Sequence, residues 1–405
     1  MLSADQEVSA EIETYKRQLA ENDLSLRDHS LLHGALGLAY AASGQRLLAR
    51  ESLTESVALA DRVGALDLAS KSQFNLALVE LSGIGREVVP TNWFAVTRSG
   101  GSKREVYGLE PDASENVTLE AVITQLELAA ENAGRSGDRA LRARALATAA
   151  KYQLARESGD NASSLLTAAH DALDASNLDR EEIEASLLVG EVGILFLSTQ
   201  SADADSVILE QSFDRLSSAL SASRVSGEQR LEAYAHGLLS RLYGLEARTD
   251  EAIALSQRAI ELAEASDSRE SLFVWHGQLA SLFEQSGDTQ SALEEYRRAT
   301  RSIQNIQSVA GAGQVSSREL IEPILLSYVE LLLRSGTRDD LMAARTVVEQ
   351  LKTIEFERFF EESCVADATG SETSIATVAE NAAVLYTGLF DDRVELIVST
   401  NSRDP

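Results

Sequence analysis

Three segments of the chain align without gaps, and their spacing is typical of paired helices. They are His33–Tyr40, His236–Tyr243 and His276–Phe283. Each begins with His-Gly, has a leucine three residues after the histidine and an aromatic residue four positions later. Residues four apart lie on one face of a helix. An alanine follows each histidine by sixteen residues, at Ala49, Ala252 and Ala292. The pattern predicts a helical hairpin in which the second helix crosses the first at the alanine.

These spacings resemble the tetratricopeptide repeat, in which leucine, small, aromatic and alanine positions recur on two helices. Ala252 and Ala292 are 40 residues apart, which fits helices longer than those of the common repeat of about 34 residues. We therefore expect an all-α fold, a right-handed α-solenoid over residues 26–353, with a capping helix within residues 1–25. The expected helix pairs lie near residues 26–62, 64–134, 138–175, 179–222, 228–266, 269–306 and 317–353.

Residues 83–117 interrupt the repeat pattern and are expected to form an inserted loop. The segment is rich in glycine and contains Trp93 and Phe94. Insertions in repeat arrays lie on one face, often the binding face. Two interpretations stay open: a binding loop that presents Trp93 and Phe94 to a protein partner, and a disordered surface loop.

The periodicity changes from helical to alternating at Ala383. Residues 383–390 and 394–399 have the pattern of two strands, and residues 391–393 that of a turn. A lone two-stranded hairpin is marginally stable in water. We therefore expect this β-hairpin to join a sheet or to be covered by a partner, as the opening of a second domain.

The stretch Leu325–Cys364 carries the most specific pattern of the chain. A leucine-rich helix leads to a Ser335-Gly336 break, then to Ala343-Ala344-Arg345, and then to Phe359-Phe360 before the cysteine. This order resembles the junction in proteins where tetratricopeptide repeats precede a CHAT domain, a caspase-like cysteine peptidase module. The resemblance implies that residues 354–382 are a junction helix and linker, and that residues 383–405 are the first strands of a truncated α/β CHAT domain.

The same resemblance implies a catalytic His–Cys dyad in which each residue follows a strand. This sequence contains neither a histidine nor a cysteine in that position, so no catalytic residue is assigned. Cys364 lies in the acidic stretch Glu361-Glu362-Ser363, and nearby carboxylates raise a thiol pKa, whereas a nucleophile needs it lowered. The resemblance therefore implies a non-catalytic, protein-binding region that regulates a peptidase domain, its own CHAT domain in the full-length protein. The alternative is a stand-alone tetratricopeptide adaptor.

Composition excludes several partners. Arginine and lysine number 36 against 64 acidic residues, a net charge of −28, which would repel nucleic acids and anionic membranes. No cofactor or metal site is predicted, because the chain contains no phosphate loop and no Cys-x-x-Cys or His-Glu-x-x-His motif. His33, His236 and His276 lie a repeat or more apart, and we expect them at helix contacts. Without a secretory signal or a long apolar run, a cytoplasmic location is expected.

The remaining candidate is a concave groove lined by the first helix of each pair. Grooves of this kind bind extended or helical peptides. The repeat register predicts six groove residues in the fifth and sixth pairs: Tyr234, Arg241, Leu245, Val274, Ser281 and Gln285.

Overall fold

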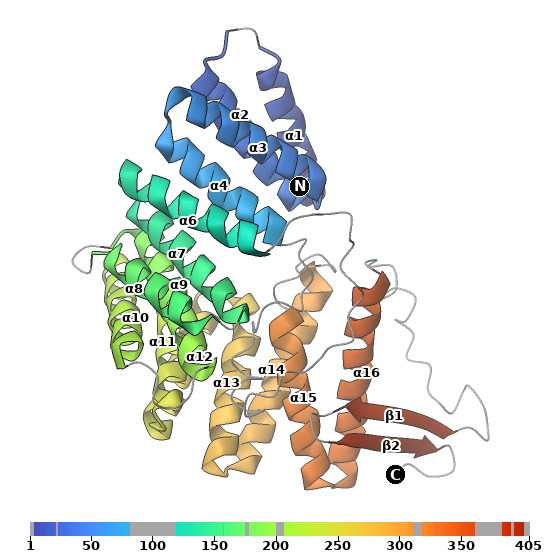
Figure 1. Ribbon diagram of the computed structural model, residues 1–405. Coiled ribbons are helices and arrows are strands. Elements are labelled where there is room, and N and C mark those ends of the chain that lie inside the picture. Colours follow the sequence, from blue (N-terminus) through green and yellow to red (C-terminus); the bar gives the residue numbers. More distant parts are fainter. Residues whose placement is uncertain are drawn as a thin grey trace. The chain divides into compact units, whose positions relative to one another are not determined.

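The computed structural model describes nine stretches of the chain. They are residues 4–21, 23–81, 119–156, 158–174, 178–199, 206–310, 318–360, 383–389 and 393–400. The described part consists of helices and one two-stranded sheet (Figure 1). It divides into two compact units, with the described residues up to Ser226 in unit 1 and those from Gly227 onward in unit 2.

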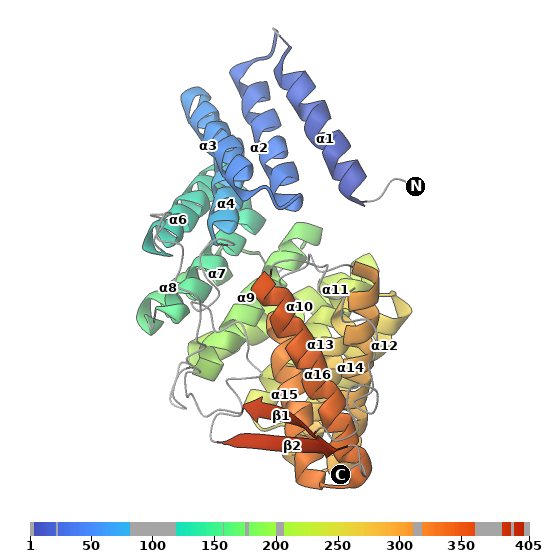
Figure 2. The same ribbon diagram turned by 90° about the vertical axis from the view of Figure 1, so that its right-hand side faces the viewer.

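Unit 1 contains the N-terminal helix and four helix pairs. Its helices are α1 Ala4–Leu19, α2 Leu26–Ala42, α3 Arg46–Val63, α4 Leu66–Leu81, α6 Leu119–Ser136, α7 Arg139–Ala155, α8 Gly159–Asp171, α9 Arg180–Thr199 and α10 Ser206–Ser226. Figures 1 and 2 show consecutive helices of this unit lying side by side. Helix α1 packs on α2 through Ile12, which is buried with Leu36 and Tyr40.

Unit 2 contains three further helix pairs and the sheet. Its elements are α11 Gln229–Leu245, α12 Thr249–Ala265, α13 Arg269–Ser286, α14 Thr289–Ala310, α15 Arg318–Ser335, α16 Arg338–Phe360, β1 Ala383–Leu389 and β2 Val394–Thr400. The predicted all-α hairpin array with a C-terminal β-hairpin is therefore confirmed. The helix pairs begin within a few residues of the expected positions. The last pair runs to Phe360, beyond the expected end at 353, so the first residues of the segment predicted as a junction helix, 354–360, belong to α16.

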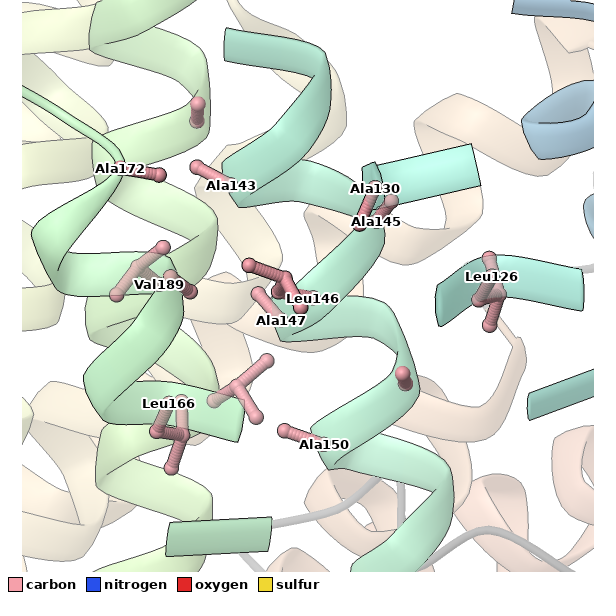
Figure 3. Packing of buried hydrophobic residues seen from close by; sticks show 14 of the residues in the cluster. Leu126, Ala130, Ala143, Ala145, Leu146, Ala147, Ala150, Leu166, Ala172 and Val189 are labelled. Atoms are coloured by element: carbon pink, nitrogen blue, oxygen red, sulfur yellow. The ribbon is translucent and has the colours of Figure 1, made fainter. Parts of the chain in front are cut away.

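Small side chains set the spacing of helices in the core of unit 1. Ala143, Ala147 and Ala150 of α7 are fully buried. Figure 3 shows Ala143 directed toward Ala172, at the end of α8. Alanine has no side-chain rotamers to fix and brings backbones close together, so an alanine-rich helix can pack on neighbours from several sides. The sparse aromatic content of the chain is consistent with this kind of core.

Larger residues fill the core of unit 2 near its C-terminal pairs. Tyr296 of α14 and Tyr328 of α15 stack with ring centroids 5.8 Å apart. Ile303 and Leu325, on the same two helices, are fully buried in the same cluster. This cluster also contains Ile397 of β2, so the sheet shares a core with the last helices.

The β-hairpin is anchored to helices rather than isolated. Its strands are antiparallel, with Tyr386 opposite Ile397 and Leu385 opposite Val398. The Tyr386 hydroxyl donates a hydrogen bond of 2.6 Å to Glu349 Oε1 of α16, and Ile397 is buried. The expected need for cover is thus met on one face by helices of this chain. Leu385 and Val398 remain exposed on the other face.

Candidate protein-binding surface

A glycine at one repeat position fixes how neighbouring pairs meet. Gly34, Gly237 and Gly277 follow the three repeated histidines. A Cβ at Gly237 would collide with the indole of Trp275 on α13, and one at Gly277 would lie 2.8 Å from Ile324 Cδ1 on α15. A Cβ at Gly34 would lie 3.3 Å from Ser72 Oγ on α4. At each glycine, therefore, the first helix of one pair touches the first helix of the next.

In unit 2 a buried polar network crosses this contact. Arg241 is only 6% exposed, and its Nε donates to Gln278 Oε1 at 3.0 Å. Gln278 Nε2 donates to the Gly237 carbonyl at 2.9 Å and to Ser256 Oγ at 3.0 Å. The guanidinium carbon of Arg241 also lies 5.6 Å from the centroid of the Trp275 ring. Arg241 thus holds the fifth and sixth pairs together, which its predicted place in a groove did not anticipate.

The other predicted groove residues differ in exposure. Ser281 is buried, whereas Tyr234 and Val274 are half-buried. The ring of Tyr234 meets that of Trp275 edge to face, at 5.3 Å and 84°. Only Leu245 and Gln285, at the C-terminal ends of α11 and α13, are exposed. In unit 2 the predicted set is therefore divided between a helix contact and two exposed ends.

Several residues singled out in the sequence lie outside the described part of the chain. These are Trp93 and Phe94 of the insertion and Cys364 of the junction. Trp93 and Phe94 stay predicted binding residues, and Cys364 has no assigned role.

The same register places exposed leucines on unit 1. Tyr234 lies three residues before Gly237 and Arg241 four after it; counted from Gly34, these positions are Leu31 and Leu38. They are 57% and 48% exposed. Ser72 lies against Gly34 as Trp275 lies against Gly237. Ser281 follows Trp275 by six residues, so its equivalent on α4 is Leu78, which is 40% exposed. We call Leu31, Leu38 and Leu78 the leucine surface. The repeat spacing could have identified it from the sequence, had the register been carried into the first two pairs.

Two of the repeated histidines are buried next to carboxylates. His276 Nδ1 lies 2.7 Å from Glu295 Oε2, and both side chains are buried. Glu295 is also paired with Arg298 at 3.0 Å. His236 Nε2 lies 3.7 Å from Glu232 Oε1 of its own helix. The contact of His276 with Glu295 joins α13 to α14, whereas that of His236 with Glu232 stays within α11. Among the described residues no group of three or more His, Cys, Asp or Glu side chains could hold a metal ion.

No described helix is both long enough and apolar enough to pass through a bilayer.

Comparison with known proteins finds similarity at the level of solved structures. The apo form of RapI matches 75% of this chain and 94% of its own, with 12% identity and a TM-score of 0.48. The Rap conjugation gene regulator of plasmid pLS20, in complex with the Phr* peptide, matches 77% and 72%, with 12% identity and a TM-score of 0.45. Aspartyl phosphate phosphatase F from Bacillus subtilis matches 88% and 92%, with 11% identity and a TM-score of 0.39. No protein-family model and no curated protein matches the chain.

Proposed function

We propose that this chain is a protein-binding helical-repeat region that recognises an amphipathic helix through the leucine surface. The observation that supports this is the exposure of Leu31, Leu38 and Leu78, on the first helices of two successive pairs. Single exposed leucines are ordinary on protein surfaces. Here, however, three of them occupy the positions equivalent to Tyr234, Arg241 and Ser281, on two helices that contact each other. Such a row is what a peptide partner with an apolar face would bury.

The spacing of these leucines fits a helical partner. Leu31 and Leu38 are seven residues apart on α2, which corresponds to about 10.5 Å along the helix axis. Packed helices lie ~8–10 Å apart, so Leu78 of α4 extends the same row sideways. Helix-in-groove recognition uses anchor residues at similar intervals on the bound helix. The net charge of −28 would additionally favour a partner with basic flanks.

Peptide selection tests the proposal. Random helical peptides would be selected on the wild-type protein and then measured against Leu31→Ser/Leu38→Ser/Leu78→Ser. Substitutions of exposed side chains usually change the stability of a protein little. The matched control is Leu47→Ser/Leu128→Ser, which changes two other exposed leucines of unit 1. We expect peptides with an apolar face that bind the wild type and the control but bind the triple variant about tenfold or more weakly. Peptides that bind all three proteins equally would contradict the proposal.

In its finer form, the proposal is that the array regulates a caspase-like CHAT domain. What supports it is the order α15, α16, β1, β2 and the anchoring of the strands on α16. The exposed Leu385, Leu396 and Val398 offer an apolar face that further strands or helices of such a domain would cover.

The gene sequence beyond the codon for Pro405 separates this form from the alternative. An open frame with a strand-end histidine and a later strand-end cysteine would support a regulated peptidase. A stop codon at that point would favour a stand-alone adaptor. Peptidase activity of this chain that is lost in Cys364→Ala would contradict the non-catalytic role.

A further inference from the structure

A pocket in unit 1 uses other helices than the leucine surface. It is open, has a volume of about 410 Å³ and is lined by residues of α6, α7 and α8. Ligand sites in proteins are commonly ~300–1,000 Å³. Its size therefore suits part of a peptide or a small ligand.

The floor of this pocket is apolar and belongs to the fixed core. It includes Ala130, Leu146 and Ala168. Ala130 is 2% and Leu146 is 8% exposed, and Figure 3 shows them on the adjacent helices α6 and α7. Because these side chains are held by core packing, the floor is formed before any ligand arrives.

The rim carries four charged side chains that have no partner within the described part of the chain. Glu127, Glu131 and Arg135 follow one another at four-residue intervals on α6, and Arg142 belongs to α7. All four are exposed, and none forms a hydrogen bond or ion pair with any residue that the structure describes. The side chain of Arg142 lies over Gly134: a Cβ added to this glycine would be 3.2 Å from Cδ of Arg142.

Some exposed arginines elsewhere in the described chain are paired with a carboxylate. Arg248 pairs with Glu251 at 3.0 Å, and Arg298 pairs with Glu294 at 2.6 Å. The rim of the pocket thus keeps two guanidinium groups and two carboxylates available around an apolar floor. Along α6 the two acids precede Arg135, which lies in the last turn.

We propose that this pocket binds a helical peptide segment of mixed charge from a partner protein. An aliphatic side chain of the peptide packs on the floor. Basic residues face Glu127 and Glu131, and acidic residues face Arg135 and Arg142. Glu127 and Arg135 are eight residues apart, about 12 Å along the helix, and a peptide helix laid along α6 repeats its charges with the same period. Complementary charges of this kind set orientation and specificity.

The site is independent of the leucine surface, so the two proposals can fail separately. The probe is a fluorescent alanine-rich helical peptide with a central leucine, two lysines four residues apart toward one end and two glutamates four apart toward the other. Its control has the same composition with the charges scrambled. Binding is followed by fluorescence anisotropy at low ionic strength, where surface charges are least screened.

We expect the ordered peptide to bind the wild type more tightly than the scrambled one. Arg135→Ala/Arg142→Ala and Glu127→Gln/Glu131→Gln should each weaken binding about three- to tenfold. Arg62→Ala, at an exposed and unpaired arginine of α3, is the matched control and should bind as the wild type does. The triple serine variant of the leucine surface should also bind the ordered peptide as tightly as the wild type does. Absence of binding, equal binding of the scrambled peptide, or unchanged binding by the double variants would overturn the proposal.

Discussion

The indole of Trp275 lies directly against the bare backbone of Gly237, where even one methyl group would collide with the ring. Trp275 is 1% exposed, so the ring has no room to move away. We expect Gly237→Ala to lower the free energy of unfolding of unit 2 by about 1–3 kcal/mol, the usual cost of overpacking. The gain in helix propensity from glycine to alanine, about 1 kcal/mol, offsets part of this loss.

Gly244 of the same helix is the matched control for this substitution. A Cβ there would meet only Leu282 Cδ2, at an ordinary 3.6 Å. Gly244→Ala should therefore stabilise the helix by up to about 1 kcal/mol. Urea unfolding of both variants measures the difference. If Gly237→Ala were as stable as Gly244→Ala, the close approach of Trp275 would be wrong.

The turns between helices offer a stabilising change. Ala247, after α11, has φ of 58°, in the left-handed region that glycine adopts at Gly287, after α13, with φ of 84°. A non-glycine residue in this region costs roughly 1–2 kcal/mol. Glycine also raises the entropy of the unfolded chain, which offsets part of the strain relief. We therefore expect Ala247→Gly to raise the unfolding free energy by only about 0.5–1 kcal/mol. Thermal unfolding measures it, and a lowered melting temperature would argue against this backbone geometry.

Acid should destabilise unit 1 through two half-buried histidines, His33 and His170. Burial lowers the pKa of His170 below its ordinary value of 6.5, and the nearby charge of Arg215 lowers it further, against the opposing charges of Asp171 and Asp214. Burial also lowers the pKa of His33. The unfolded chain then binds protons more readily than the folded one, so stability is present above pH 6.5 and is lost as pH falls through the lower folded values.

The measurement for these histidines is the slope of unfolding free energy against pH between about 7.5 and 5.5. Wild-type stability should fall toward the acid end of this range. His170→Gln and His33→Gln each remove one titrating group and should flatten the slope. A slope that neither substitution changes would mean that other groups set the acid sensitivity.

The helix pairs could be predicted from the sequence because their determinants are local. Leucine and aromatic positions at helical spacing and the crossing alanines mark the first, fifth and sixth pairs, the amphipathic period marks the pairs between residues 119 and 222, and the alternating pattern after Ala383 marks the strands. Exposure of the groove positions could not be predicted in the same way. Whether Arg241 faces solvent depends on the next pair, where Gln278 and Trp275 cover it. At the equivalent position of α2, Leu38 stays exposed. The register transfers between pairs, whereas burial depends on residues some forty positions away.

The anchoring of the β-hairpin can be tested on two neighbouring residues of β2. Ile397 is 7% exposed within the core shared with α15 and α16, whereas Val398 is 49% exposed on the opposite face. Replacing a buried isoleucine by alanine typically costs 2–5 kcal/mol, more than a two-stranded hairpin can lose and stay ordered. Ile397→Ala should therefore abolish hydrogen-exchange protection of β1 and β2 while leaving α11 to α14 protected.

Val398→Ala is the matched control for that experiment, since it truncates a β-branched side chain one position along the same strand. We expect it to leave exchange in the hairpin close to that of the wild type. Equal loss of protection in both variants would mean that the exposed face contributes as much as the helix-facing one. Retained protection in Ile397→Ala would mean that polar contacts hold the strands on the helices in place of apolar packing. These contacts are the hydrogen bond from Tyr386 to Glu349 of α16 and the ion pair of Arg393 with Glu330 of α15.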